Sequence, residues 1–349
     1  MAPIRVLVID DSASARDVLS SILRADPAMA VTVAADPFVA ARLIREAAPD
    51  VITLAAAMPR RQGLTFLREL MAQRPLPVVM CASALEDKAE ALFVALEAGA
   101  VDVILLPRVD AIAQREERHA HIRATVKGAA RARPLPRPAT EAPPRRLPAE
   151  AIPAPSHAAG PVVCVGAATG GTAALIEVIA ALPAGAPATV VVQHLPEPIT
   201  RALARRLDTL AAVEVREASD GDELTRGRVL IAPGGTRHTL LGRRGARYFV
   251  QLRDGPLVAC RRPSVDVLFR SAARAAGANA VGILLTGMGD DGARGLLDLR
   301  RSGARTIAQD EETSVVFGMA REAIAHGAAD RVVPLGRIAR ELLQAGARQ

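Results

Sequence analysis

Short apolar runs alternate with amphipathic segments through the N-terminal third of the chain. The runs typical of buried strands are Arg5–Ile9, Ala30–Ala34, Val51–Ala55, Pro77–Cys81 and Asp102–Leu106. Between them lie segments of roughly 10–15 residues whose apolar positions recur at helical spacing. Strands that alternate regularly with helices of this length form parallel sheets. The pattern therefore predicts an α/β domain built on a five-stranded parallel sheet.

A second α/β pattern starts near residue 161 and continues towards the C-terminus. The apolar run Val162–Val165 is a predicted strand, and a predicted helix starts at Thr172. The glycine-rich turn Gly166–Gly171 joins them, and such a turn directs a side chain and free backbone N–H groups towards one point. Its third residue is Ala168, which offers only a methyl group there.

The two patterns are separated by a charged, helix-compatible stretch and a proline-rich segment. Residues 131–156 contain eight prolines and five arginines and almost no large apolar residues. Such a composition cannot build a core and is typical of an extended linker. We therefore expect a first domain over residues 1–128, a linker over 129–158 and a second domain over 159–349.

Composition narrows the function classes. The net charge of +7 comes almost entirely from arginine, since Lys88 and Lys127 are the only lysines. One Tyr, six Phe and no Trp leave little aromatic surface on which bases could stack, so nucleic acid is not an expected partner. The positive charge favours acidic proteins over nucleic acid as partners. No apolar run reaches the length of a membrane span, so membrane insertion is not expected.

The cysteines and the N-terminal sequence indicate a cytoplasmic protein. The chain has only three widely spaced cysteines, and Cys81 and Cys164 lie in apolar runs as small core residues do. The first residues read as a strand rather than as a signal peptide.

Two acids, Asp10 and Asp11, follow the first predicted strand. Carboxylates at the carboxyl edge of a parallel sheet suit Mg²⁺ and phosphoryl chemistry. The stretches Val6–Ala13 and Met58–Leu64 resemble response-regulator receiver domains of two-component signalling. The resemblance implies a flavodoxin-like fold that accepts a phosphoryl group on an aspartate.

The residues that this family uses for phosphorylation are replaced here. The resemblance implies an aspartate at position 55, a Ser or Thr at about 82 and a lysine at 106, where this chain has Ala55, Ala82 and Leu106. We therefore expect a folded receiver that cannot be phosphorylated. Asp10 and Asp11 alone would hold a metal only weakly, so no cofactor is expected.

The second domain supplies an imidazole, His194, and a carboxylate, Asp291, at strand ends. Seven ordered motifs there resemble the chemotaxis protein-glutamate methylesterase (CheB) family: Val165–Gly171, Val192–Pro196, Ile231–Gly235, Arg262–Phe269, Leu285–Gly292, Thr306–Glu311 and Val315–Met319. The resemblance implies a doubly wound α/β methylesterase domain that acts on methylated chemoreceptors and deamidates their glutamines. It also implies partnership with those receptors and possible contact with the chemotaxis histidine kinase.

The same resemblance implies roles for individual residues. A serine at position 168 would attack the methyl ester of a receptor glutamate, His194 would take and return its proton, and Asp291 would orient the imidazole. Backbone N–H groups at Thr169, Gly170 and Met288 are candidate oxyanion donors. Asp290 is the neighbouring acid, and Asp291 is preferred because it occupies the family position.

Ala168 lacks the oxygen on which this mechanism depends. One hypothesis is a non-catalytic homologue, a pseudoenzyme that binds receptors or regulates the array. The alternative is an active esterase that uses Thr169, Cys164 or a water activated by His194. The turn also approximates a dinucleotide fingerprint, but the second strand ends in Gln193-His194 rather than in the acid that holds a ribose.

Overall fold

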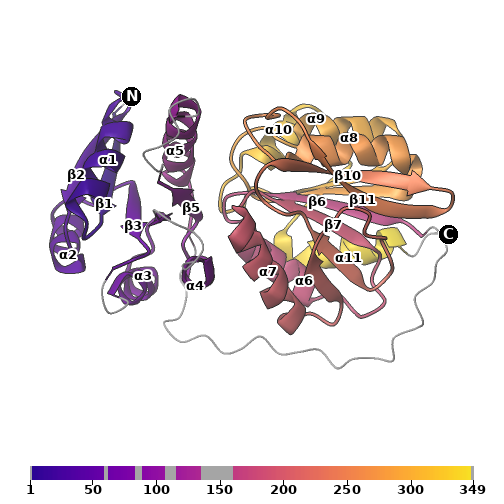
Figure 1. Cartoon of the computed structure of the whole chain (residues 1–349), viewed down its shortest axis with the longest axis horizontal. Coiled ribbons are helices and arrows are strands. Elements are labelled where there is room, and N and C mark those ends of the chain that lie inside the picture. The colour runs from indigo at the N-terminus through magenta and orange to yellow at the C-terminus, as the bar shows by residue number, and fades with distance from the viewer. Residues whose placement is uncertain (1, 59–61, 83–88, 107–114, 135–159, 347–349) are drawn as a thin grey trace. The chain divides into compact units, whose positions relative to one another are not determined.

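The computed structural model describes residues 2–58, 62–82, 89–106, 115–134 and 160–346 (Figure 1). The chain divides into two compact units, residues 1–142 and 143–349, which are described separately below. Most of the predicted linker, residues 135–158, lies outside the described residues.

The first unit is built on a parallel sheet. Its strands are β1 (Ile4–Ile9), β2 (Met29–Ala34), β3 (Val51–Ala55), β4 (Val78–Ala82) and β5 (Asp102–Leu105). They are hydrogen-bonded in the order β2-β1-β3-β4-β5, and every pairing is parallel. The five-stranded parallel sheet expected from the apolar runs is confirmed.

The helices of the first unit are α1 (Ala13–Arg24), α2 (Pro37–Glu46), α3 (Gln62–Gln73), α4 (Ala89–Glu97) and α5 (Arg115–Ala129). Local chemistry fixes where α2 begins. The carboxylate of Asp36 accepts hydrogen bonds from the N–H groups of Phe38 and Val39, at 2.8 and 2.9 Å. Pro37 occupies the first turn, where its missing N–H costs nothing.

The second unit contains a seven-stranded sheet in which every pairing is parallel. Its strands are β6 (Val162–Ala167), β7 (Thr189–Gln193), β8 (Glu214–Glu217), β9 (Arg228–Ile231), β12 (Ala280–Leu284), β13 (Arg305–Gln309) and β14 (Arg331–Val333). The order β14-β13-β12-β6-β7-β9-β8 reverses direction at β6. In open α/β sheets, ligands bind beyond the carboxyl ends of the strands at such a reversal.

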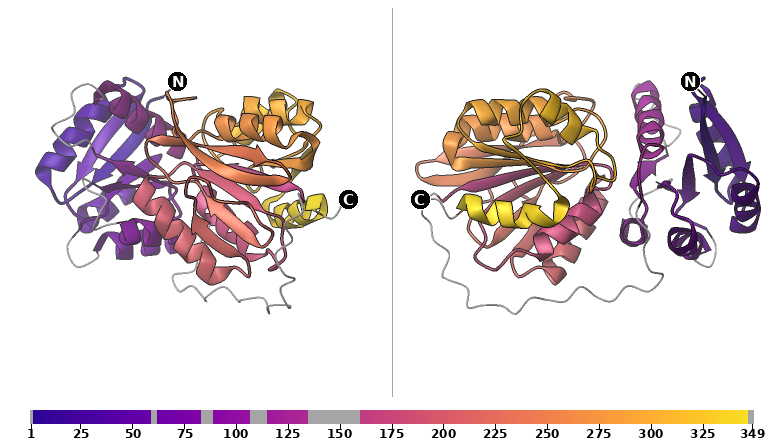
Figure 2. Two further views of the ribbon diagram at one scale, coloured as in Figure 1. Left: turned by 45° about the vertical axis from the view of Figure 1, so that its right-hand side comes forward. Right: turned by 180° about the vertical axis from the view of Figure 1, so that it is seen from behind.

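Helices cover both faces of this sheet (Figures 1 and 2). The helices α8 (Val265–Ala275), α9 (Ala293–Arg301) and α10 (Met319–Ala325) lie on one face, and α6 (Gly171–Ala180), α7 (Glu197–Leu210) and α11 (Leu335–Gly346) lie on the other. A short 3₁₀ helix, Gly277–Asn279, precedes β12. The antiparallel hairpin of β10 (Arg237–Arg244) and β11 (Arg247–Asp254) was not predicted from the sequence.

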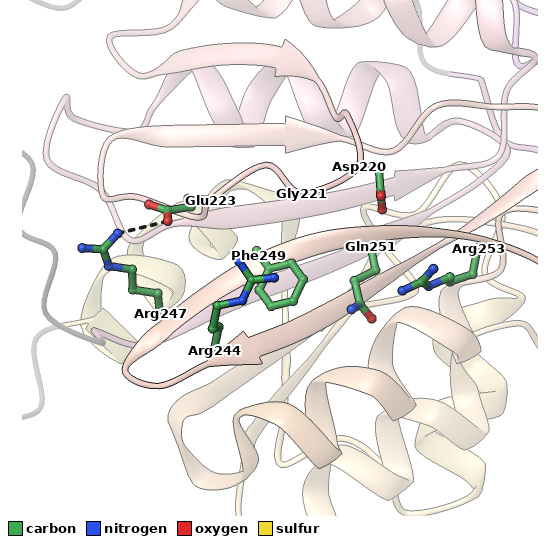
Figure 3. Close-up of a pocket in the computed structure, with 8 residues that line it drawn as sticks. All are labelled: Asp220, Gly221, Glu223, Arg244, Arg247, Phe249, Gln251 and Arg253. Atoms are coloured by element: carbon green, nitrogen blue, oxygen red, sulfur yellow. Dashed lines mark hydrogen bonds and ion pairs between the residues drawn. The ribbon is translucent and has the colours of Figure 1, made fainter.

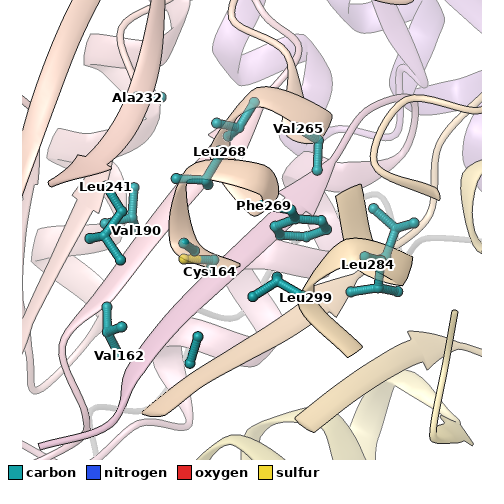
Figure 4. Close-up of a cluster of buried hydrophobic side chains, with 14 of the residues drawn as sticks. Val162, Cys164, Val190, Ala232, Leu241, Val265, Leu268, Phe269, Leu284 and Leu299 are labelled. Atoms are coloured by element: carbon teal, nitrogen blue, oxygen red, sulfur yellow. The ribbon is translucent and has the colours of Figure 1, made fainter. Parts of the chain in front are cut away.

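One hydrophobic cluster joins the sheet, α8 and the hairpin (Figure 4). Cys164 of β6, Phe269 of α8 and Leu284 of β12 are completely buried in it, and Leu241 of β10 is 3% exposed. Truncating a side chain as large as Phe269 in such a core typically costs about 3–5 kcal/mol. This packing holds the first turn of α8 firmly against the sheet edge where β6 and β12 end.

In the part of the chain that the structure describes, no helix is both long enough and apolar enough to cross a bilayer.

Candidate active site

Three neighbouring strands of the second unit bring the predicted site residues to one edge. Ala168 follows β6, His194 follows β7 and Asp291 lies in the loop after β12. Hydrogen bonds extend the strand pairing past the strand ends. The N–H of His194 donates to the carbonyl of Ala167 at 3.1 Å, and the N–H of Leu285 donates to that of Gly166 at 2.9 Å.

The backbone of the turn after β6 is fixed from several sides. The N–H of Ala168 donates to the carbonyl of Thr286 at 3.0 Å. The carbonyl of Ala168 accepts from Gln193 Nε2 and from the N–H of Gly171, both at 2.8 Å. Gly170 has a φ of +78°, and a Cβ there would lie 2.5 Å from Val315 Cβ. The turn thus takes its shape without help from the side chain of Ala168.

His194 and Asp291 form a buried pair. His194 Nε2 lies 2.9 Å from Asp291 Oδ2, and their side chains are 5% and 3% exposed. The other ring nitrogen of His194, Nδ1, is buried and has no hydrogen-bond partner among the described residues. The carboxylate can only accept, so Nε2 carries a proton, and in the neutral imidazole the lone pair lies on Nδ1. The imidazole is therefore arranged as a base.

The first turn of α8 holds the Asp291 carboxylate. It accepts hydrogen bonds from Ser264 Oγ at 2.7 Å and from the N–H groups of Val265 and Asp266 at 2.9 and 3.0 Å. Burial alone would raise the pKa of Asp291, but the bonds from His194 and from this helix turn together outweigh it and leave the pKa below its ordinary value. Asp291 is therefore ionised at neutral pH.

A second buried acid, Asp266, shapes the loop that carries Asp291. Its Oδ1 accepts from the N–H groups of Gly292 and Gly295, at 3.0 and 2.6 Å. Burial raises its pKa most strongly, and the nearby charge of Asp291 raises it further, against the opposing effect of the Gly295 N–H and Arg270. Two carboxylates in one buried network thus have opposite pKa shifts.

No role was predicted from the sequence for Ser264, Asp266 or Gln193, although all three lie in motifs that resemble the methylesterase family. A usable signal was present at Ser264, because a serine just before an apolar helical run is typical of an N-cap. Its side chain does accept from the N–H of Val267, at 3.4 Å. No comparable pattern marks Gln193 as a support for the turn.

The other predicted residues of the second unit lie nearby with different surroundings. Asp290 is exposed, so only its neighbour Asp291 enters the buried pair. The carbonyl of Thr169 accepts from Thr286 Oγ1 at 3.0 Å, and Met288 is half-buried in the loop after β12. Cys164 is completely buried, and burial raises the pKa of its thiol to about 12.

In the first unit, the residues at the positions expected for phosphorylation lie at the strand ends. Ala55 and Ala82 are 4% and 3% exposed, and Leu106 is half-buried. Asp10 accepts from the N–H of Ser12 at 2.9 Å, while Asp11 is exposed. The described residues contain no cluster of three acidic, histidine or cysteine side chains that could hold a metal. This donor set does not fit a resident Mg²⁺ ion.

Comparisons with known proteins match both units. The family model of the response regulator receiver domain matches residues 6–114, and that of the CheB methylesterase matches residues 163–342. A protein-glutamate methylesterase/protein-glutamine glutaminase of Rhodospirillum rubrum is 56% identical, over 99% of both chains. One of Anaeromyxobacter dehalogenans is 58% identical, over 98% of this chain and 96% of its own.

A solved structure extends the agreement to the fold. The CheB methylesterase catalytic domain of Thermotoga maritima is 39% identical, with a TM-score of 0.52, and the match covers 53% of this chain and 98% of that one. Together with the two family models and the full-length relatives, it places the chain plainly: the protein belongs to the CheB methylesterase family and carries an N-terminal receiver domain.

Proposed function

We propose that this chain is a CheB-type chemotaxis protein that recognises methylated receptors but neither hydrolyses their esters nor accepts a phosphoryl group. The observation that carries this proposal is the methyl group of Ala168 at the position where the resemblance requires a nucleophile, on the same sheet edge as the hydrogen-bonded His194–Asp291 pair. The relatives are named for methylesterase and glutaminase activity. The substrate class of this chain is taken to be theirs.

The proton chemistry explains why a single methyl group matters. In a serine hydrolase, the base removes the hydroxyl proton as the oxygen attacks the ester carbonyl, and the acid stabilises the resulting imidazolium. Ala168 has neither the proton to give nor the oxygen to form the bond. Loss of a triad nucleophile typically lowers turnover about 10⁶-fold. Recognition of the ester by the surrounding residues does not depend on that oxygen.

Neither neighbouring nucleophile is well suited to replace it. Cys164 lies inside the hydrophobic cluster with its thiol neutral at physiological pH, and only a thiolate attacks carbonyls effectively. Thr169 is 2% exposed, and its branched side chain is stiff. Both observations favour a binding or regulatory role over an esterase with a substitute nucleophile.

A second candidate function is slow hydrolysis by water. The specific observation in its favour is the unpartnered Nδ1 of His194, which could accept a proton from a water at the site. Residual catalysis of this kind typically exceeds the uncatalysed rate by about 10³–10⁴-fold. It would leave the protein a slow esterase rather than a silent one.

The receiver supports the same overall proposal. Without a carboxylate at position 55 there is no acceptor for a phosphoryl group, and Leu106 supplies no cation to contact it. The proposed partners of the chain are the methyl-accepting receptors and their histidine kinase, in the cytoplasm. All three cysteines are free thiols, in keeping with a reducing compartment.

The decisive measurement is methanol release from radiolabelled, methylated chemoreceptor membranes. We expect no release above background from the native chain and clear release from Ala168→Ser, because the turn and the His194–Asp291 pair are already in place. The matched control is Ala168→Ser combined with His194→Ala, which keeps the new hydroxyl but loses its base and should again be silent. Release by the native chain that disappears in His194→Ala would instead establish the water mechanism.

A further inference from the structure

The hairpin of β10 and β11 carries an unusual local charge. Between Arg237 and Arg253 the chain has five arginines and no aspartate or glutamate. The strands pair antiparallel, with Arg244 opposite Arg247 and Gly242 opposite Phe249. Alternate residues of a strand share one face, so Arg247, Phe249, Gln251 and Arg253 lie on the same side of β11. None of these residues belongs to the candidate active site.

The two faces of the hairpin differ sharply. On one face Leu241, Tyr248, Val250 and Leu252 are buried in the hydrophobic cluster. The opposite face borders an open cavity of about 440 Å³ (Figure 3). Its lining comes from the hairpin and from the segment that runs along the edge of β11, and consists of Asp220, Gly221, Glu223, Arg244, Arg247, Phe249, Gln251 and Arg253.

An aromatic platform holds one arginine in this cavity. The ring of Phe249 lies directly over Gly242, where an added Cβ would come within 2.6 Å of a ring atom. The guanidinium of Arg244 stacks on the same ring, 5.2 Å from its centroid (Figure 3). Such stacking orders an arginine without neutralising its charge. The absence of a side chain at Gly242 is what allows this arrangement.

The acids of the opposite wall are already engaged. Glu223 pairs with Arg247 at 3.1 Å, and Asp220 accepts the N–H of Leu252 at 2.8 Å. By contrast, the side chains of Arg244 and Arg253 are exposed and have no hydrogen bond or ion pair among the described residues. The cavity therefore presents two unneutralised guanidinium groups with an apolar ring nearby.

The register of the hairpin sets the spacing of these two charges. Arg244 lies opposite Arg247, and Arg253 is six positions further along β11. At about 3.4 Å per residue this places the two backbone positions about 20 Å apart. An extended partner would bridge them with acidic residues about six positions apart.

We propose that this face of the hairpin is a docking site for an acidic polypeptide segment, with carboxylates on Arg244 and Arg253 and an apolar side chain on Phe249. Guanidinium groups bind carboxylates through paired hydrogen bonds. A polypeptide can place single carboxylates at the two arginines, whereas a dense phosphate surface would also meet Asp220 and Glu223. The site does not depend on ester hydrolysis, so a test of peptide binding is separate from a test of the function proposed above.

Fluorescence anisotropy with the full chain tests this site. The probe is a labelled peptide, Glu-Glu-Ser-Ser-Leu-Ser-Ser-Glu-Glu, compared with one of the same composition whose glutamates form a single block. We expect the spaced peptide to bind more tightly. Replacing Arg244 and Arg253 together by alanine should weaken it about ten-fold, since exposed charge pairs are individually modest.

The matched control replaces Arg337 and Arg340, two exposed arginines of α11, by alanine. It removes the same charge elsewhere and should leave binding of the spaced peptide nearly unchanged. Equal weakening by both double variants would overturn the proposal, because binding would then reflect net charge alone. So would hairpin-dependent binding to anionic vesicles or duplex DNA without binding to the peptide. Circular dichroism of each variant confirms that it is folded.

Discussion

Asp266 and Asp291 are buried in one hydrogen-bond network, yet burial and partners move their pKa values in opposite directions. The Asp291 carboxylate accepts hydrogen bonds from a histidine, a serine and two backbone N–H groups. Together these bonds lower its pKa by more than burial raises it. The Asp266 carboxylate accepts hydrogen bonds from two glycine N–H groups, but burial and the negative charge of Asp291 raise its pKa. The carboxylate that hydrogen bonds stabilise more strongly as an anion is thus the one that contacts the imidazole.

The raised pKa of Asp266 has a sign that can be tested. Because the folded state binds this proton more tightly than the unfolded chain, Asp266 favours folding at low pH. That contribution is complete below the ordinary aspartate pKa of about 3.9 and is lost as pH rises through the raised value. Asp266→Asn keeps an oxygen for Gly292 and Gly295 and removes the charge.

We therefore expect Asp266→Asn to unfold at a higher temperature than the native chain near pH 7, with the difference shrinking as pH falls towards 4. Calorimetry across that range measures it. Asp298→Asn is a suitable control, because this more exposed acid also contacts Arg270, at 3.2 Å. A difference that grew on acidification would contradict the assignment.

At the scale of elements, the first turn of α8 serves both the fold and the site. Ser264 caps the helix through Val267 and also donates to Asp291. The same turn supplies two N–H groups to that carboxylate, at the end of the helix where anions are favoured. The helix α8, which Phe269 anchors in the hydrophobic cluster, therefore also positions Asp291, and Asp291 orients His194.

Ser264→Ala should accordingly destabilise the folded protein by more than the loss of an ordinary helix N-cap does. Loss of the cap is worth about 1 kcal/mol, and a buried hydrogen bond to a charged group adds about 1.5–3 kcal/mol. We expect the thermal transition of the second unit to fall by about 5–10 °C. Ser12→Ala removes the exposed cap of α1 and should shift only the transition of the first unit, by a few degrees at most. Equal effects would refute the shared role.

The positions of helices and strands could be predicted from the sequence better than the tertiary contacts between side chains. Apolar runs located the strands of the first unit almost to the residue; the central strands β3 and β4 are buried on both faces and therefore need continuous apolar segments. The edge shared by Ala168, His194 and Asp291 followed from motifs at strand ends. The hairpin escaped prediction because its glycine and arginines mask the alternation of β10, and the bond from Gln193 to Ala168 is a tertiary contact without a local signature.

On the scale of the whole molecule, the proposed function removes one chemistry from each of the two units. The receiver lacks an acceptor at Ala55 and a cation at Leu106, and the second unit lacks a nucleophile at Ala168. Both units nevertheless keep complete sheets and buried cores. Signalling through this protein should therefore depend on binding rather than on its phosphorylation state.

Radiolabelled acetyl phosphate tests the receiver directly. We expect no label on the native chain and label on the triple variant Ala55→Asp, Ala82→Ser, Leu106→Lys, which restores the family residues. Small-angle scattering of the native chain should be the same before and after beryllofluoride. Stable labelling of the native chain, or an expansion on adding beryllofluoride, would show that another residue accepts the group.

The turn that holds Ala168 has a consequence for the history of this gene. Its shape comes from backbone hydrogen bonds to Thr286, Gln193 and Gly171, so exchanging a hydroxyl for a hydrogen there places little strain on folding. Alanine and serine codons can differ by a single base. If hydrolysis is absent as proposed, one mutation at position 168 would therefore suffice to restore the nucleophile, whereas the receiver would need separate changes at positions 55, 82 and 106.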